Sequence, residues 1–297
     1  MLAVVQFYWS AVVLLLPLLA CAGIGAYWAK RDYPFGGTFI TMLVTTVTTP
    51  ALVFHTFVTT QLDDRALLAI AGASLLALLA CALACAGLLR LFGLPVRTLL
   101  PTAFVPNAGN LGLPVSQLAF GDAGLSAAVA FFAVNSFVTH TIAVRMLPGA
   151  NTPGSWKSPV LLASVAAVTL RALDIPVPDW VVATSRMLGA VTVPLMLLSL
   201  GHALALIPAN GMRAGAVVAA LRLAVGLAAG YAVVWLLGLP DLLAGALALQ
   251  MAMPCAVVSY MYARRYTDVG DIAAGAVLVS TVVFLLLAPA LLWFTRQ

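Results

Sequence analysis

The sequence predicts an all-α polytopic membrane protein with ten transmembrane helices, in which the fourth and ninth helices are broken. Three observations lead to this fold class. Of the 297 residues, 64% are hydrophobic and 8% are charged, which leaves too little polar surface to coat a soluble domain. Apolar runs of membrane length follow one another with only short connectors between them. Prolines, glycines and asparagines interrupt two of these runs.

The ten spans are apolar runs of about 20 residues, the length that crosses a bilayer as a helix. Short connectors that carry most of the charge, such as Lys30-Arg31-Asp32, separate them. Because no Lys or Arg precedes Lys30, we expect the first run to be a retained helix and not a signal peptide. The spans cover residues 3–29, 37–60, 66–92, 98–120, 123–147, 158–173, 180–206, 213–237, 241–264 and 270–294.

The fourth span contains the segment FVPNAGNLGLPVSQLAFG, from Phe104 to Gly121. A proline removes a backbone donor and disfavours helix at the preceding residue, so we expect Pro106 and Pro114 to break this helix. Lipid offers no partner to the freed peptide groups. Such a break is therefore tolerated only where it is buried in protein or lines a wet cavity, as at the binding site of a transporter.

The distribution of cations predicts the topology. Nine Lys and Arg side chains fall on one side of the predicted spans and four on the other, so the positive-inside rule places the nine-cation side in the cytoplasm and both termini outside it. The formal net charge of +5 is then a topology signal. No basic run with interleaved aromatic residues is present, and we expect no nucleic-acid partner. The two sets are Lys30, Arg31, Arg90, Arg97, Arg145, Lys157, Arg213, Arg264 and Arg265 against Arg65, Arg171, Arg186 and Arg296.

The two halves of the chain repeat the same landmarks in the same order. Each half has a proline in its second span, a Leu-Pro step before the broken span, and a proline break followed by Gly-Asp; these are Pro50 and Pro194, Leu94-Pro95 and Leu239-Pro240, and Pro106 and Pro254. Because five is odd, the second copy enters the membrane from the opposite side. We expect a first repeat over residues 1–147, a short cytoplasmic connector over 148–157 and an inverted second repeat over 158–297.

Three stretches resemble the auxin efflux carrier family. FVPNAGNLGLP is similar to the broken fourth helix of that family. MPCAVVSYMYARRYTDVGDIAAGAVLVSTVV resembles the ninth helix and its continuation in bacterial members, and TVPLMLLSLGHAL is similar to the pattern of the seventh helix. The plant relatives, the PIN-FORMED auxin exporters, carry a long hydrophilic loop between the halves. Here the connector runs only from about residue 147 to residue 157, too short for such a loop.

The resemblance implies a bile-acid-symporter-like (NhaA-like) fold. In that fold helices 4 and 9 cross within a mobile transport domain of helices 3–5 and 8–10. Helices 1, 2, 6 and 7 form a scaffold, through which two copies pair as a homodimer. Elevator-type movement of the transport domain gives alternating access. By the same resemblance Asn107 is the leading substrate contact, Pro106 and Pro254 shape the crossover, and Asn110 helps to satisfy the open backbone.

The chemistry of a resuming helix points to an anion. Its free N–H groups and positive dipole end face the cavity, and the amides of Asn107 and Asn110 add donors and acceptors. The alternative is that both asparagines only cap broken helix ends. Cys255 and Ser259 share a face after the second break and either line the site or pack within the bundle.

Buried ionisable residues are further candidates. Arg222 lies on the order of 13 Å deeper along its helix than Arg213, where it attracts the anion, pairs internally or extends its stem back to the interface. His55 and His140 are candidates for binding an anion or carrying a proton, or are packing residues. Every acidic residue is an aspartate near a span end, which argues against a carboxylate-built sodium or proton site.

These features support three functional hypotheses. The first is a secondary transporter of small organic anions, such as auxin-, malonate- or malate-like carboxylates, in the cell (inner) membrane. The second is a Na⁺- or H⁺-coupled symporter or a metalloid-oxyanion exporter on the same fold, and the third a membrane sensor that only binds. No catalytic, cofactor or metal motif is present, and Cys81 and Cys85 lack a nearby His or carboxylate. We therefore expect no enzyme activity, cofactor or metal.

Overall fold

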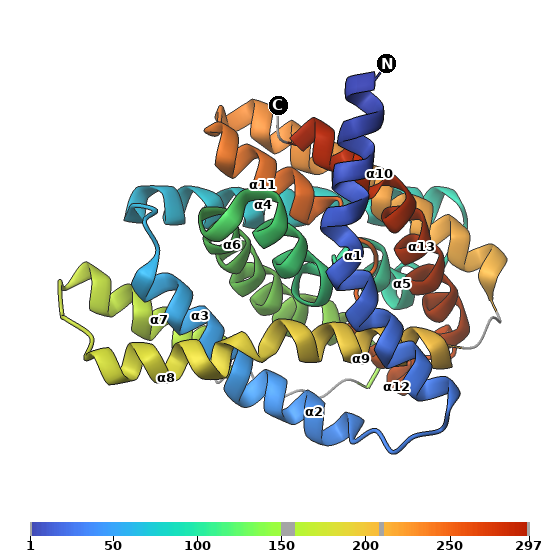
Figure 1. Ribbon diagram of the computed structural model, residues 1–297. Helices are drawn as coiled ribbons and strands as arrows, with labels where there is room; N and C mark the ends of the chain where they lie inside the picture. Colours follow the sequence, from blue (N-terminus) through green and yellow to red (C-terminus); the bar gives the residue numbers. More distant parts are fainter. Residues whose placement is uncertain (1, 150–157, 208–210, 296–297) are drawn as a thin grey trace.

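The structure, a computed structural model, describes residues 2–149, 158–207 and 211–295. Every regular element in these ranges is helical (Figure 1). Within the described residues, six helical segments are long and apolar enough to cross a membrane: Gly37–Thr59, Asp64–Leu91, Ala108–Met146, Asp179–Leu206, Met212–Leu237 and Gly270–Leu292. The prediction of an all-α polytopic membrane protein is confirmed in this form. Most of the predicted connector, residues 150–157, lies outside the described residues.

The first half of the chain contains the following elements, in order. They are α1 (Leu2–Lys30), α2 (Gly37–Leu43), the π-helical turn η1 (Val44–Thr48), α3 (Thr49–Thr59), α4 (Asp64–Leu91), α5 (Val96–Phe104), the π-helical turn η2 (Ala108–Gly112), α6 (Leu113–Val138), the π-helical turn η3 (Thr139–Ala143) and the 3₁₀ turn η4 (Val144–Met146). Within α6 the chain turns sharply at Gly121 (φ 66°), a conformation that glycine adopts without steric cost. This turn separates the predicted spans 98–120 and 123–147.

The second half contains α7 (Pro159–Ala172), α8 (Asp179–Ala190), α9 (Thr192–Leu206), α10 (Met212–Leu237), α11 (Asp241–Met251), α12 (Val257–Tyr266) and α13 (Gly270–Thr295). A non-helical stretch between α11 and α12 matches the one between α5 and η2 in the first half. Both predicted breaks at Pro106 and Pro254 are therefore present.

The expectation that Pro114 breaks its helix is wrong. Pro114 lies at the start of α6, directly after η2, and the helix continues through it. Pro50 lies at the start of α3, directly after η1. A π-helical turn is wider than an α-helical one and moves the hydrogen-bond pattern by one residue. The turn before each proline thus removes the need for the donor that proline lacks.

The helices pack in two groups. In Figure 1, α3, α7, α8 and α9 lie below α4, α6, α10 and α11, and α1 runs in front of both groups. In the first group α1 crosses α9, and α3 packs against α7 and α8. In the second group α10 packs against α13, α4 and α11, while α6 packs against α11 and α4. The crossing of α1 and α9 is close because it is made at two glycines. A Cβ atom on Gly25 would meet the main chain of Leu198, and one on Gly201 would meet the main chain of Ala22.

Outward-facing and inward-facing positions differ in size more than in polarity. Large apolar side chains lie on the outside, among them Leu83, Trp180 and Trp235 at 76%, 71% and 85% exposure. Small residues such as Ala73 and Ala77 are fully buried between helices. This distribution is expected in lipid, where apolar surface needs no cover and small residues let helices approach.

Candidate functional site

The two breaks in the helices meet and pair with each other. The N–H of Asn107 donates to the carbonyl of Pro254 at 2.8 Å, and the N–H of Ala256 donates to the carbonyl of Val105 at 3.1 Å. The two segments run antiparallel, with Pro106 opposite Cys255. Neither Pro106 nor Pro254 occupies a position where this pairing requires a main-chain N–H donor. This pairing satisfies peptide groups that lipid would leave without partners.

Arg222 lies where the helices before the breaks end. Its Nε donates to the carbonyl of Met253 at 3.2 Å, one Nη donates to the carbonyl of Phe104 at 2.5 Å, and the other donates to the carbonyl of Met251. The Sγ atom of Cys81 accepts a further contact at 3.4 Å. The side chain of Arg222 is fully buried. It thus pairs internally with main-chain carbonyls and does not extend to the interface.

A cavity of about 530 Å³ lies where the helices resume after the breaks. Val105, Pro106 and residues 107–110 line it from the first break, and Ala256 and Val258 line it from the second. The described residues of its lining include no Asp, Glu, Lys or Arg. The remaining lining residues are Thr41, Thr45, Thr46, Thr49, Phe132, Asn135, Ser136, Thr139, His140, Ser158, Pro159, Val160, Met196, Met261 and Tyr262.

Four polar atoms in the lining residues are buried and have no hydrogen-bond partner within the described chain. They are Asn107 Nδ2, Asn135 Oδ1, Thr49 Oγ1 and Thr139 Oγ1. Asn107 is only 4% exposed. Buried polar groups in folded proteins are nearly always hydrogen-bonded, so four unpaired atoms at one cavity indicate that a ligand or water completes the site. They offer an amide donor, an amide acceptor and two hydroxyls.

The candidate residues from the sequence divide between the cavity and its surroundings. Asn107, Asn110, Pro106 and His140 line the cavity, and His140 Nδ1 lies 2.7 Å from the carbonyl of Ser136. Pro254 contributes through its carbonyl to the crossover.

Three other candidates do not line the cavity. Cys255 is fully buried and its N–H donates to Ser280 Oγ at 3.0 Å, while Ser259 Oγ donates to the carbonyl of Ala256 at 2.6 Å. Both are placed as packing residues. His55 is half-buried on α3, and its Nδ1 has no partner within the described chain.

Thr49, Asn135 and Thr139 were missed by the sequence analysis. A signal for two of them was present, since Asn135 and Thr139 are four residues apart, as are Ser136 and His140, and such spacing places polar side chains on one helix face. Within an apolar span, a polar stripe of this kind indicates a wet or protein-lined surface.

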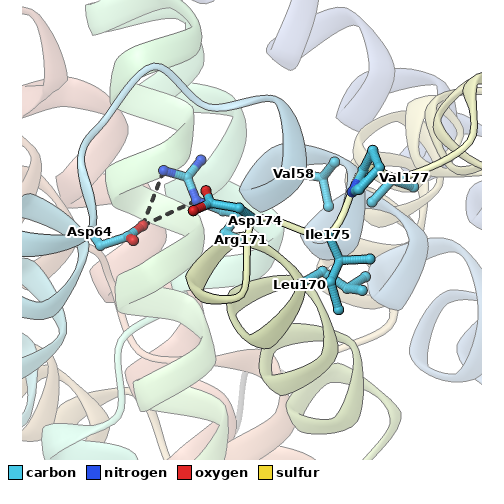
Figure 2. Close-up of a pocket in the computed structure, with 8 residues that line it drawn as sticks. Val58, Asp64, Leu170, Arg171, Asp174, Ile175 and Val177 are labelled. Atoms are coloured by element: carbon cyan, nitrogen blue, oxygen red, sulfur yellow. Dashed lines mark hydrogen bonds and ion pairs between the residues drawn. The ribbon is translucent and has the colours of Figure 1, made fainter.

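A second cavity, of about 400 Å³, lies at the end of α7 (Figure 2). There the guanidinium of Arg171 binds the Asp64 carboxylate at 3.1 Å, the one ion pair among the described residues. It also donates to the carbonyls of Phe57, Thr60 and Leu62 at 2.9–3.0 Å. Every donor group of Arg171 is thus engaged within the protein, and we interpret this region as structural.

Replacing Arg171 with alanine is expected to lower the free energy of unfolding by about 2 kcal/mol, because three carbonyls at the end of α3 and in the following loop lose a charged donor. Asp64→Asn is expected to cost less than about 1 kcal/mol, because the carboxylate is 55% exposed and an exposed ion pair contributes little. Thermal unfolding in detergent measures both. Equal losses would mean that the ion pair, and not the carbonyl contacts, holds this end of α7.

The fold and the site together define a class of protein. Broken helices that cross beside a cavity with unpaired polar side chains, in a chain of apolar helices, are the features of a membrane transporter. The family model described as membrane transport protein matches residues 10–156 and 152–292. The chain belongs to this family, in agreement with its resemblance to auxin efflux carriers. A comparison with curated proteins finds no match.

Proposed function

We propose that this protein is a secondary transporter of small organic anions, with carboxylates as the substrate class. The observation that carries the proposal is the side chain of Asn107, which is buried, has an unpaired Nδ2 atom and lines the cavity. An amide donor without a partner fits a ligand that accepts hydrogen bonds. A carboxylate is such a ligand.

The helix that begins after the first break supports an anion in particular. Asn107 immediately precedes η2, which continues into α6, so the N–H groups of residues 108–110 belong to a first helical turn and have no acceptor within the helix. The start of a helix carries roughly half a positive charge. Among the described residues the cavity lining has no Lys or Arg, so these dipoles and the Asn107 amide are the groups there that would bind the anion.

We further propose that the protein has the ten spans, the 5+5 inverted repeat and the two domains expected from the sequence. Each of the ten predicted ranges contains helix, which supports the count. The helices α1, α3, α7, α8 and α9 make most of their contacts with one another, which supports a scaffold that is distinct from a transport domain. Elevator-type movement and a homodimer through the scaffold rest on the family resemblance. The inner membrane, with both termini outside the cytoplasm, rests on the cation asymmetry.

Flux into proteoliposomes tests the proposal. Labelled malate, malonate and indole-3-acetate are offered to the purified protein, with and without Na⁺ and pH gradients. We expect saturable flux of at least one acid that exceeds the flux in protein-free vesicles. Saturable binding of an acid without flux would favour a sensor. If protein that melts cooperatively shows no binding and no flux with any acid, the carboxylate assignment is refuted.

Proton linkage is a second candidate because His140 is the one histidine among the residues that line the cavity. If His140 carries the coupled proton, an inward proton gradient accelerates uptake in the wild type and has no effect in His140→Gln, which keeps a hydrogen-bonding side chain of similar size. The ratio of uptake with and without the gradient is the measurement. His55→Gln is the matched control, since His55 does not line the cavity. A gradient response that survives in His140→Gln would exclude this role.

A further inference from the structure

Arg222 is a buried cation that has no carboxylate partner among the described residues. It is fully buried, and its partners are three main-chain carbonyls and a cysteine sulfur. The ion pair found among the described residues, between Arg171 and Asp64, does not involve it. A buried cation without an acidic partner is costly, so its persistence requires a strong source of negative potential nearby.

The helix ends supply that potential. The carbonyl of Phe104 is the last of α5, and those of Met251 and Met253 lie at the end of α11 and just beyond it. Carbonyls in the last turn of a helix have no partner within it, and each helix end carries roughly half a negative charge. Two such ends meeting in a low dielectric therefore call for about one positive charge. Arg222 provides one.

A glycine on α10 leaves space for the guanidinium of Arg222. Gly226 lies one turn further along α10, and a Cβ atom there would collide with the Arg222 guanidinium and with the carbonyl of Met251. Two further carbonyls at the crossover also have partners. The carbonyl of Val105 accepts a hydrogen bond from the N–H of Ala256, and the carbonyl of Pro254 accepts one from the N–H of Asn107. The carbonyls of Phe104, Val105, Met251, Met253 and Pro254 thus each accept a hydrogen bond within the protein.

We propose that Arg222 is the resident cation of the crossover, a positioning residue whose guanidinium occupies a carbonyl site that would otherwise bind a metal cation such as Na⁺. Its fixed charge holds the ends of α5 and α11 together and so places Asn107, three residues beyond Phe104, at the cavity. Neither the folded crossover nor substrate binding then requires Na⁺. The statement on substrate binding rests on the proposed function, whereas the statement on the crossover does not.

Thermal unfolding of the purified protein in detergent tests the crossover without any substrate. Na⁺ is titrated from 0 to about 100 mM against choline at constant ionic strength. We expect the wild-type melting temperature to stay constant. We expect Arg222→Met, which preserves apolar volume, to melt about 10 °C lower because three buried carbonyls lose their donor. Arg222→Lys, which keeps the charge, is expected to melt between the two, although apolar packing alone would favour methionine over lysine.

Chemical rescue separates the charge from the packing. In Arg222→Ala, guanidinium at about 10 mM is expected to restore at least half of the lost melting temperature by entering the vacated site, while urea at the same concentration restores nothing. Leu221→Ala is the matched control, since Leu221 is a buried neighbour on α10 whose removal leaves an apolar cavity. Guanidinium is expected to leave its melting temperature unchanged.

Distinct results would overturn the proposal. A saturable rise of the wild-type melting temperature with Na⁺ would show that the fold is stabilised by Na⁺ although Arg222 is in place, which contradicts the proposal. Arg222→Met melting at or above Arg222→Lys would show that volume and not charge matters. If Arg222→Ala does not fold, the wild-type titration and the Lys and Met comparison still decide. In proteoliposomes, flux of any acid found to be transported must persist when choline replaces Na⁺. Absence of flux for every acid would refute the proposed function and leave the unfolding results standing.

Discussion

Asn107→Asp is expected to weaken the binding of a transported carboxylate by more than about 100-fold, and Asn107→Ala by about 10-fold. Alanine removes one donor to a charged acceptor, which contributes about 1.5 kcal/mol at the lower end of its range, or roughly 10-fold in affinity. Aspartate keeps the size of the side chain but replaces the unpaired Nδ2 with a second oxygen, so it adds repulsion between like charges. The concentration dependence of flux in proteoliposomes, or of ligand-induced thermal stabilisation, measures both.

Ser74→Ala is the matched control for these variants. Ser74 is buried on α4, and its hydroxyl donates to the carbonyl of Ile70, away from the cavity. Its replacement is expected to leave affinity unchanged. If Asn107→Asp binds the acid as tightly as the wild type, the side chain of Asn107 is not a substrate contact. Tighter binding of a cation in that variant would point to another substrate class.

Gly25→Ala is expected to destabilise the protein by about 3 kcal/mol, the upper end of the range for overpacking. The added Cβ atom would meet the main chain of Leu198, which has no rotamer by which to move away. α1 and α9 must then separate, and their contact is the main one that α1 makes. In thermal unfolding the midpoint should fall by about 10 °C.

Gly23→Ala supplies the control on the same helix. Nothing lies within 4 Å of a Cβ atom at Gly23, so this change adds only helix propensity and is expected to be neutral or slightly stabilising. Gly201→Ala, which would meet the main chain of Ala22 from the other side of the crossing, should match Gly25→Ala. If Gly23→Ala and Gly25→Ala melt together, α1 and α9 do not cross as closely as described.

The sequence predicted the breaks because proline acts locally. Pro106 and Pro254 lack a donor wherever they stand, and membrane-length apolar runs around them leave few ways to compensate. The same local argument failed at Pro114. There a π-helical turn, Ala108–Gly112, precedes the proline and removes the need for its missing donor. No residue type in that turn predicts π-helical geometry.

The partners of Arg222 were beyond sequence reasoning for a different reason. They are main-chain carbonyls of Phe104, Met251 and Met253. Because every residue has such a carbonyl, the residue type does not indicate which carbonyls accept from Arg222. The sequence therefore left three alternatives open for Arg222. The site residues were predicted in part, since Asn107 stands at the break itself, whereas Thr49, Asn135 and Thr139 reach the cavity from helices whose placement depends on tertiary packing.

The pairing of the two breaks also sets an order of events during biosynthesis. Val105 and Asn107 bond to residues about 150 positions further along the chain, so at about 5–20 residues per second roughly 8–30 s separate the synthesis of the two partners. During that interval the peptide groups of the first break lack the partners that pair with them in the folded protein. The carbonyl of Phe104 likewise lacks its donor until Arg222 is synthesised. The nascent first half must therefore be sheltered, by water or by the insertion machinery, until α10 and α11 arrive. A first half released alone would expose unpaired peptide groups to lipid, which makes it a substrate for membrane quality control.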